Sequence, residues 1–199
     1  MIINKKYILA STSKSRYHIL KNAGFNFKQV NPLCDEEEIK KKIKNKLKKP
    51  ALIAKKLSFE KARSISLKNK YFYDYIIGCD TLIYLNDKIY DKAKTLNEAR
   101  MKIKRLSGKE HKIVSGLTIC KEGKKIWQCE TTTKIKVRKI NSSAINHYLN
   151  KTGNQILQSV GCYQIESFGP LIIEDIKGDF FNVMGLPLFK LLKFIANQK

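Results

Sequence analysis

Residues 75–92, YIIGCDTLIYLNDKIYDK, combine the pattern of a buried strand with two charged residues that a core would exclude. The runs YIIGC and LIYL are short, β-branched and aromatic, which favours a buried strand over a helix. Asp80 follows the first run, and Lys92 returns after a short hairpin. Because α/β sheets bind ligands beyond the ends of their strands, we expect Asp80 to face a ligand-binding cleft.

The segments around this hairpin alternate between strand and helix patterns, which predicts an α/β protein. The length suits one sizeable core, so residues 1–199 are expected to form a single domain with two lobes. Alternating residues on both sides of Glu122-Gly123 predict a long antiparallel hairpin. The expected strands are residues 7–10, 25–30, 111–120, 125–137 and 171–176. The expected helices are residues 17–23, 51–67 and 96–106, one capped by Ser142 or Ser143, and one begun by Pro187.

The composition predicts a compact globular protein, because 43% of the residues are hydrophobic and 10% are aromatic. No apolar run approaches the roughly 18 residues that cross a membrane, and the N-terminal run is too short for a signal peptide. We therefore expect a cytoplasmic protein with no membrane contact. The five cysteines are scattered and odd in number with no CxxC pair, which favours free thiols over disulfides or a zinc site.

The formal net charge of +23 is an ordinary reason to propose nucleic-acid binding. Lys and Arg are spread along the chain, however, at 13, 10, 12 and 5 in successive stretches of fifty (the last forty-nine). The densest run, residues 40–49, has no interleaved aromatic residue for base stacking and is expected to be a solvated helix face. The charge leaves open only weak, non-specific binding of nucleic acid through phosphates.

The segment STSKSR, residues 11–16, lies between an expected strand and an expected helix. Free amides at a helix N-terminus attract anions, and Ser11, Ser13 and Arg16 would add hydrogen-bond donors. The same serines are ordinary helix caps in many proteins, and this segment alone favours that interpretation.

Three further charged residues have simple default interpretations. Glu36 belongs to an acidic cluster that suits the first turn of an exposed helix. It becomes more than that only if it faces Asp80, where two carboxylates could hold a hard divalent cation. Lys61 is by default a surface lysine, and His111, on an alternating strand, is expected to be a packed structural residue.

The motifs for Walker loops, nucleophile elbows, zinc proteases and dinucleotide folds are absent from the sequence. Four other segments occur in order along nearly the whole chain: LASTSKSR at residues 9–16, LSFEKA at 57–62, GCDT through LSGKEH at 78–111, and GDFFNVMGLPL at 178–188. They are similar to LASxSPRR, LAxxKA, GADT…GKP…LSGxxH and GDYxNVVGLPL, and together they resemble the Maf family of nucleoside triphosphate pyrophosphatases.

The resemblance implies a Maf/inosine-triphosphatase-like α/β fold, with a curved mixed β-sheet, flanking helices and two lobes around a central cleft. It implies a homodimer and a hydrolase of acid anhydrides that cleaves a nucleoside triphosphate to the monophosphate and pyrophosphate, for house-cleaning of the nucleotide pool. It makes Asp80 the catalytic residue and assigns Mg²⁺ (or Mn²⁺) to Glu36 and Asp80. The implied substrate-binding set is Ser11, Ser13, Arg16, Lys61 and Lys92.

Departures from the family pattern concern the choice of base. Ser15 stands in place of an arginine of SPRR, which removes a planar bidentate donor. Glu166 is similar to the branch that acts on 7-methyl-GTP, whereas Thr81 matches the pyrimidine branch. A carboxylate only accepts hydrogen bonds where an amide also donates, so the resemblance implies specificity at Ser15, Thr81 and Glu166 and leaves the base open.

Two rival interpretations remain at this stage. One is a binding protein without catalysis, either a basic nucleic-acid-associated protein or a Maf-like regulator of cell division and septum formation. The other is an inosine-triphosphate-type pyrophosphatase of related architecture. Pyrophosphate release from a panel of nucleoside triphosphates separates the enzymes from the binding protein, and base preference separates the two enzymes.

Overall fold

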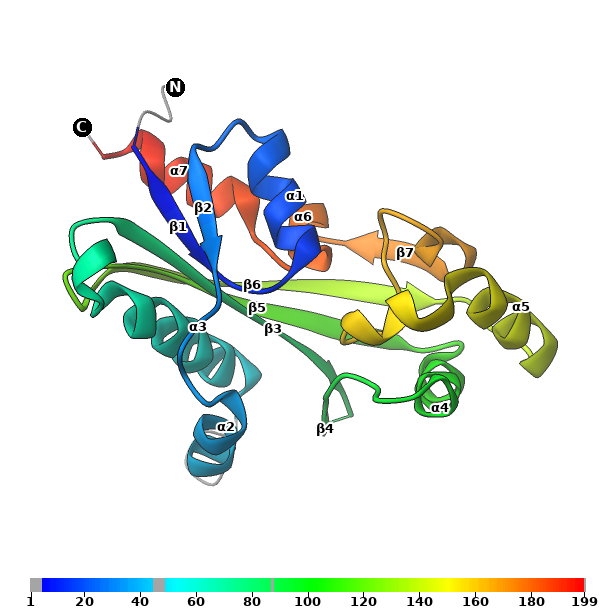
Figure 1. Ribbon diagram of the computed structural model, residues 1–199. Helices are drawn as coiled ribbons and strands as arrows, with labels where there is room; N and C mark the ends of the chain where they lie inside the picture. Colours follow the sequence, from blue (N-terminus) through cyan, green and yellow to red (C-terminus); the bar gives the residue numbers. More distant parts are fainter. Residues whose placement is uncertain (1–4, 45–48, 87, 199) are drawn as a thin grey trace. The chain divides into compact units, whose positions relative to one another are not determined.

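The computed structural model describes residues 5–44, 49–86 and 88–198, which form an α/β structure (Figure 1). The strands are β1 (Tyr7–Ala10), β2 (Phe27–Val30), β3 (Tyr75–Leu85), β4 (Lys88–Tyr90), β5 (Glu110–Lys121), β6 (Lys124–Val137) and β7 (Ile173–Lys177). The α-helices are α1 (Lys14–Asn22), α2 (Glu36–Lys44), α3 (Pro50–Ser66), α4 (Leu96–Leu106), α5 (Ser142–Thr152), α6 (Phe180–Val183) and α7 (Leu188–Ala196). Short 3₁₀ segments are η1 (Asn69–Tyr71), η2 (Gly153–Gln158) and η3 (Gly169–Leu171).

The strands form one seven-stranded mixed sheet in the order β2-β1-β3-β5-β6-β7, with β4 paired to β3. β1 is parallel to both β2 and β3, while β4 is antiparallel to β3 and β7 is antiparallel to β6. The prediction of an α/β fold with a mixed sheet and flanking helices is therefore confirmed.

The chain divides into two compact units. The first unit comprises residues 1–81, 114–131 and 185–199, and the second comprises residues 82–113 and 132–184. Strands β3, β5 and β6 contribute residues to both units.

In the first unit, α1 and α7 lie on one side of the strands and α3 lies on the other (Figure 1). Helix α3 approaches β3 closely because Gly78 has no side chain. A Cβ built at Gly78 would lie 2.2 Å from the Ser58 carbonyl oxygen and 2.7 Å from the Ala62 nitrogen, which is too close for any other residue. This contact brings α3 against the strand two residues before Asp80.

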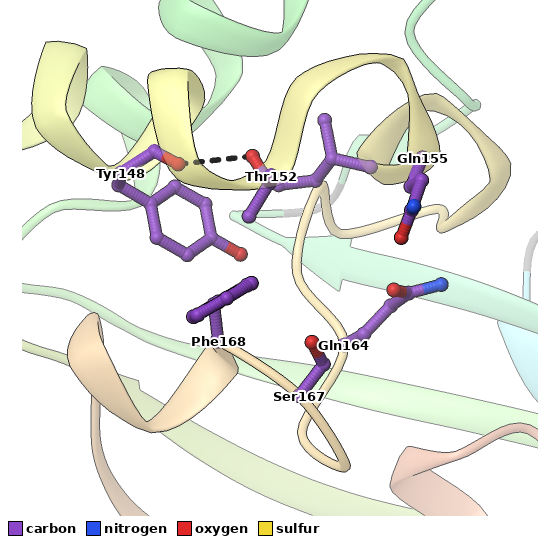
Figure 2. Close-up of a pocket in the computed structure, with 7 residues that line it drawn as sticks. Tyr148, Thr152, Gln155, Gln164, Ser167 and Phe168 are labelled. Carbon is purple, nitrogen blue, oxygen red and sulfur yellow. Dashed lines mark hydrogen bonds between the residues drawn. The ribbon is translucent and has the colours of Figure 1, made fainter.

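In the second unit, α4 and α5 pack with η2 around a buried core. Among its largest buried side chains are Ile83, Ile103, Leu106 and Tyr148. A small pocket opens beside α5, η2 and the loop before η3, and Figure 2 shows Gln155 and Gln164 among its lining side chains. The pocket has room for about one water molecule, and its lining side chains are uncharged.

Several element boundaries differ by a few residues from those expected, and two of the differences have a clear cause. Asn141, rather than Ser142 or Ser143, caps α5 by accepting from the Ala144 amide, because an amide oxygen reaches the third residue as well as a serine does. The expected strand at residues 171–176 starts later, at Ile173, because Pro170 lies in the 3₁₀ turn η3. The basic run at residues 40–49 lies partly outside the described residues; within it, Lys41 and Lys42 of α2 are exposed as expected.

The structure also bears on the predictions about thiols and membrane spans. All five cysteines are free, and Cys79, Cys120 and Cys162 are buried. In the described part of the chain, no helix has both the length and the apolarity of a membrane span.

His111, expected to be structural, is buried in the second unit on β5. Its Nε2 atom lies 2.7 Å from the Tyr163 hydroxyl, and its Nδ1 atom is buried with no hydrogen-bond partner among the described residues. Burial lowers the pKa of His111 to about 4, although Glu110 acts in the opposite direction. The imidazole is therefore neutral at neutral pH.

This lowered pKa predicts a loss of stability in acid. The unfolded chain binds a proton at His111 as the pH falls through 6.5, whereas the folded chain resists it until about pH 4. The stability linked to His111 is complete above pH 6.5 and is lost between pH 6.5 and 4, by about 3 kcal/mol in total. Urea unfolding at pH 7, 6, 5 and 4 should show a steeper loss in the wild type than in His111→Gln. Equal slopes for the two proteins would contradict the assignment.

Candidate active site

Asp80 forms a buried ion pair with Lys61 in the first unit. The Lys61 Nζ atom of α3 donates to Asp80 Oδ1 at 2.7 Å, and the two side chains are 7% and 8% exposed. Asp80 Oδ2 is also buried and has no hydrogen-bond partner among the described residues. One carboxylate oxygen is thus fixed by the protein, and the other is oriented but unsatisfied.

Lys61 also contacts Glu36, so one ammonium group bridges two carboxylates. Lys61 Nζ lies 2.9 Å from Glu36 Oε2, which comes from the first turn of α2 and is 39% exposed. Lys61 lies on the buried face of α3 with Leu57 and Ala62, which is why the default expectation of a surface lysine is wrong. Glu36 does face the Asp80 group, as its metal role would require.

The donor set of this cluster fits a hard divalent cation. Two carboxylates and one ammonium leave one net negative charge, and Asp80 Oδ2 is a buried oxygen without a donor. The described residues contain no group of three or more histidine, cysteine or acidic side chains that could enclose a metal. Mg²⁺ is commonly held by one or two carboxylates together with water and substrate phosphates, so Asp80 and Glu36 suffice for that mode only.

Arg16 anchors a second cluster in the same unit. Its Nε atom donates to the Gly185 carbonyl at 2.8 Å, its Nη1 atom to Ser11 Oγ at 3.2 Å, and its Nη2 atom to Thr81 Oγ1 at 3.1 Å. Thr81 Oγ1 lies 2.8 Å from Ser115 Oγ. These bonds hold the guanidinium in one orientation and use three of its five N–H groups.

The loop before α1 is ordered by its own serines. Ser13 caps α1 by accepting from the Arg16 amide at 3.4 Å, and Ser11 Oγ accepts from the Ser13 amide at 3.2 Å. The structural role that the segment alone favoured is therefore present. Phosphate binding by Ser11, Ser13 and Arg16 stays a prediction, and Ser15 is half-buried in the first turn of α1.

The two clusters contact opposite faces of β3. Successive side chains of a strand alternate in direction, so Asp80 points to α3 whereas Cys79 and Thr81 point to Gly185, whose carbonyl accepts from both. The pairing of β1 with β3 ends at Ala10 and Gly78, so Asp80 and Thr81 extend beyond the end of β1. A strand end of this kind is where α/β sheets expose ligand sites.

Lys92 and Glu166, the remaining predicted site residues, belong to the second unit. Lys92 is exposed between β4 and α4. Glu166 is exposed in the loop between η2 and η3. The structure therefore brings Glu36, Lys61 and Asp80 together in one cluster. Ser11, Arg16 and Thr81 form a second cluster. Lys92 and Glu166 belong to the other compact unit.

Sequence reasoning missed three participants, namely Cys79, Ser115 and Gly185. Gly185 has a φ of +102°, a backbone conformation that favours glycine, and this conformation turns its carbonyl toward Arg16. The GLPL segment contained this signal, because an isolated glycine before a helix start commonly marks such a turn. Nothing in the spacing of Ser115 distinguishes it from other buried strand serines.

Comparison with known proteins gives a consistent family. The model described as Maf-like protein matches residues 6–198. A nucleoside triphosphate pyrophosphatase of Caulobacter vibrioides is 37% identical over 187 residues, 94% of this chain and 92% of that protein. A 7-methyl-GTP pyrophosphatase of Brucella abortus is 33% identical over 194 residues, 98% of this chain and 96% of that protein.

Among solved structures, a nucleoside-triphosphatase / dITP/XTP pyrophosphatase from Mycobacterium abscessus aligns with 97% of this chain and 94% of that chain. The TM-score is 0.42 and the sequence identity 12%. The match of the family model to nearly the full length, together with relatives above 30% identity, shows that the chain belongs to the Maf family.

Proposed function

We propose that this protein is a nucleoside triphosphate pyrophosphatase, a hydrolase that releases pyrophosphate and a nucleoside monophosphate. The observation that carries the proposal is Asp80, a buried carboxylate with one oxygen fixed by Lys61 and the other unsatisfied. The names of the relatives from Caulobacter vibrioides and Brucella abortus support the same activity.

In the proposed reaction, water attacks the α-phosphorus and the bond to the oxygen that bridges to the β-phosphorus breaks. Pyrophosphate leaves with that oxygen, and the proton of the water passes to the Asp80 carboxylate and then to solvent. Lys61 keeps the Asp80 carboxylate in one rotamer, so Oδ2 needs no reorientation during the reaction. Mg²⁺ or Mn²⁺ held by Asp80 and Glu36 would neutralise phosphate charge and lower the pKa of bound water.

The remaining cationic groups suit a triphosphate. Arg16 retains two N–H groups beyond its bonds to Gly185, Ser11 and Thr81, and these can donate to phosphate oxygens. Ser11 and Ser13 order the loop that presents Arg16. Lys92, which is exposed in the second unit, stays a predicted phosphate ligand. Lys61 differs from these groups, because its two carboxylate contacts give it the task of positioning Asp80.

For the base, we propose that Glu166 favours a guanine over a pyrimidine. The Watson–Crick edge of guanine presents two adjacent donors, which match the two acceptor oxygens of a carboxylate. Uracil and thymine present a single donor between acceptors and suit an amide instead. A 7-methyl-GTP substrate adds a positive charge on the base, and the Brucella abortus relative carries that substrate in its name. Ser15 and Thr81 stay predicted specificity positions, with Thr81 also supporting Arg16.

The proposal also includes a homodimer in the cytoplasm, a single domain over residues 1–199, and a role in removing unwanted nucleotides from the nucleotide pool. A role in septum formation and weak nucleic-acid binding are the alternatives that the panel of nucleoside triphosphates tests. If no nucleoside triphosphate in the panel releases pyrophosphate and the protein shows salt-sensitive DNA binding, the result would favour a binding protein without catalysis.

The first prediction from this proposal concerns Asp80. Asp80→Asn is expected to lower kcat/KM at least about 1,000-fold with Mg²⁺, because an amide neither takes the proton nor holds the cation. The fold should persist, since the amide oxygen can still accept from Lys61 and Glu36 still pairs with that lysine. Pyrophosphate release and thermal unfolding together check this; wild-type turnover in the variant would refute the role of Asp80.

The second prediction concerns the buried charge on Lys61. Lys61→Met leaves the buried Asp80 carboxylate without its partner, which should lower the unfolding free energy by about 3 kcal/mol and abolish turnover. Lys56→Met on the same helix is the matched control, because Lys56 makes a surface pair with Glu60 at 2.6 Å and a cation–π contact with Phe59 at 5.5 Å. That control should lose less than about 1 kcal/mol. Similar losses in the two variants by urea unfolding would contradict a buried bridge.

The third prediction concerns the base. Glu166→Gln is expected to shift the ratio of kcat/KM for 7-methyl-GTP over UTP by about tenfold toward UTP, as one acceptor becomes a donor. Glu174→Gln, an exposed change on β7, is the control and should leave the ratio unchanged. An unchanged ratio in Glu166→Gln would remove the base-reading role and leave the pyrophosphatase proposal standing.

A further inference from the structure

Helix α4 carries a lysine in the face that should be apolar. The buried residues of this helix are Ala99, Lys102, Ile103 and Leu106, which recur at the spacing of a single helix face. Lys102 is 9% exposed, whereas Lys104 on the same helix is exposed. Lysine is rarely buried unless it is paired, so its partners define what it does.

The Lys102 ammonium binds two backbone carbonyls that are distant in sequence. Its Nζ atom donates to the carbonyl of Asp91, and also to the carbonyl of Val160 at 3.1 Å. Asp91 directly precedes Lys92, and Val160 lies six residues before Glu166. All of these residues belong to the second unit, so the contact lies within one compact body.

A second contact links the same two segments. Burial raises the pKa of the Cys162 thiol, and the backbone N–H of Ala93, the residue after Lys92, lies near enough to the thiol to lower that pKa in part. The Cys162 carbonyl in turn accepts from the Tyr148 hydroxyl at 3.3 Å. The residues on both sides of Lys92 are therefore joined to the start of the loop that ends in Glu166, through Lys102 on one side and directly on the other.

The chemistry of Lys102 indicates a fixed structural link. Burial lowers the pKa of Lys102, with Cys162, Asp91 and Glu98 acting in the opposite direction. A methionine has a similar length and would fill the same space without this desolvation, but it would leave two backbone carbonyls without their donor, which costs stability. What methionine lacks is the pair of N–H donors that hold two carbonyls at one distance from each other.

We propose that Lys102 is a positioning residue that couples the lysine for the triphosphate, Lys92, to the loop for the base, Glu166. The inference rests on the proposed function for the roles of Lys92 and Glu166, while the coupling itself rests on the contacts to Asp91 and Val160. Lys102 contacts no substrate. It fixes the spacing between the group that holds phosphate and the group that reads the base, so that one substrate length and one base fit together.

The test compares Lys102→Met with Lys104→Met, which removes the same charge from the exposed side of the same helix. We expect Lys102→Met to raise KM for 7-methyl-GTP about tenfold and to leave kcat within about twofold. The reason is that a misplaced Lys92 weakens the binding of the substrate and of the transition state equally. The ratio of the kcat/KM values for 7-methyl-GTP and UTP should move at least about threefold toward one. The melting temperature should fall only slightly, because the loss is confined to the hydrogen bonds of two carbonyls.

A readout that needs no activity accompanies the kinetics. Hydrogen exchange should accelerate at least about tenfold in residues 91–95 and 160–166 of Lys102→Met, and remain unchanged in α1. Lys102→Gln keeps an amide that can donate to one of the two carbonyls and should fall between the wild type and Lys102→Met in both measurements. It also serves if the methionine variant fails to fold.

The outcomes separate this inference from the proposed function. A large fall in melting temperature and a lower kcat with unchanged KM would make Lys102 a merely structural residue and overturn the inference. Kinetics and exchange equal to those of Lys104→Met would overturn it as well. An inactive wild-type protein would overturn the proposed function instead, and the exchange data would then decide the coupling of the two segments.

Discussion

The buried ammonium of Lys61 is the interaction on which the candidate site depends. A carboxylate as buried as Asp80 would be costly without a partner, and Lys61 supplies that partner at 2.7 Å. The same ammonium reaches Glu36 and so connects the start of α2 to the middle of β3 through α3. Three elements that follow one another along the chain thus share one charge, and the site exists only while that charge stays in place.

The electrostatics of the chain act at two ranges. The overall charge of +23 attracts a polyanionic substrate toward the protein from a distance. The cluster of Glu36, Lys61 and Asp80 is locally negative, which suits a cation that would accompany the phosphates. A basic protein with an acidic centre therefore needs no nucleic acid to account for its charge.

The second unit shows a different principle. Its predicted ligand groups, Lys92 and Glu166, are exposed, but the backbone beside them is anchored to a buried core through Lys102, Cys162 and the His111–Tyr163 contact. Exposed side chains on anchored backbone lose little freedom when they bind a ligand, which lowers the entropic cost of recognition.

Much of the fold could be predicted from local pattern, and much of the site could not. The strand at residues 75–85 and the helix at residues 96–106 are visible because their apolar spacing is regular and their ends carry turn residues. Lys61 was misjudged from spacing alone, since a helical pattern shows which face is buried but not which charge a distant strand will supply. The family resemblance assigns Lys61 to substrate binding, and that role stays a prediction.

Lys102 had a signal that could have been read, because it occupies an apolar stripe, but its two partners are backbone carbonyls and leave no trace in the sequence. The three donors to the Gly185 carbonyl come from α1 and β3 and could not be assigned from the sequence either, although the glycine itself marks a turn. Main-chain acceptors are chosen by the fold, so only their donors can be suspected from the sequence.

The alternation along β3 has a consequence for how this protein can change. Asp80 serves one face of the sheet and Thr81 the other, so a deletion or insertion of one residue before them would exchange the two faces. After a deletion, Thr81 would take the place of Asp80 beside the Lys61 ammonium; after an insertion, Asp80 would take the place of Thr81 beside the Arg16 guanidinium. Either cluster can change by substitution. The number of residues between Tyr75 and Asp80 positions both clusters, so an insertion or deletion in this part of the strand would disrupt both.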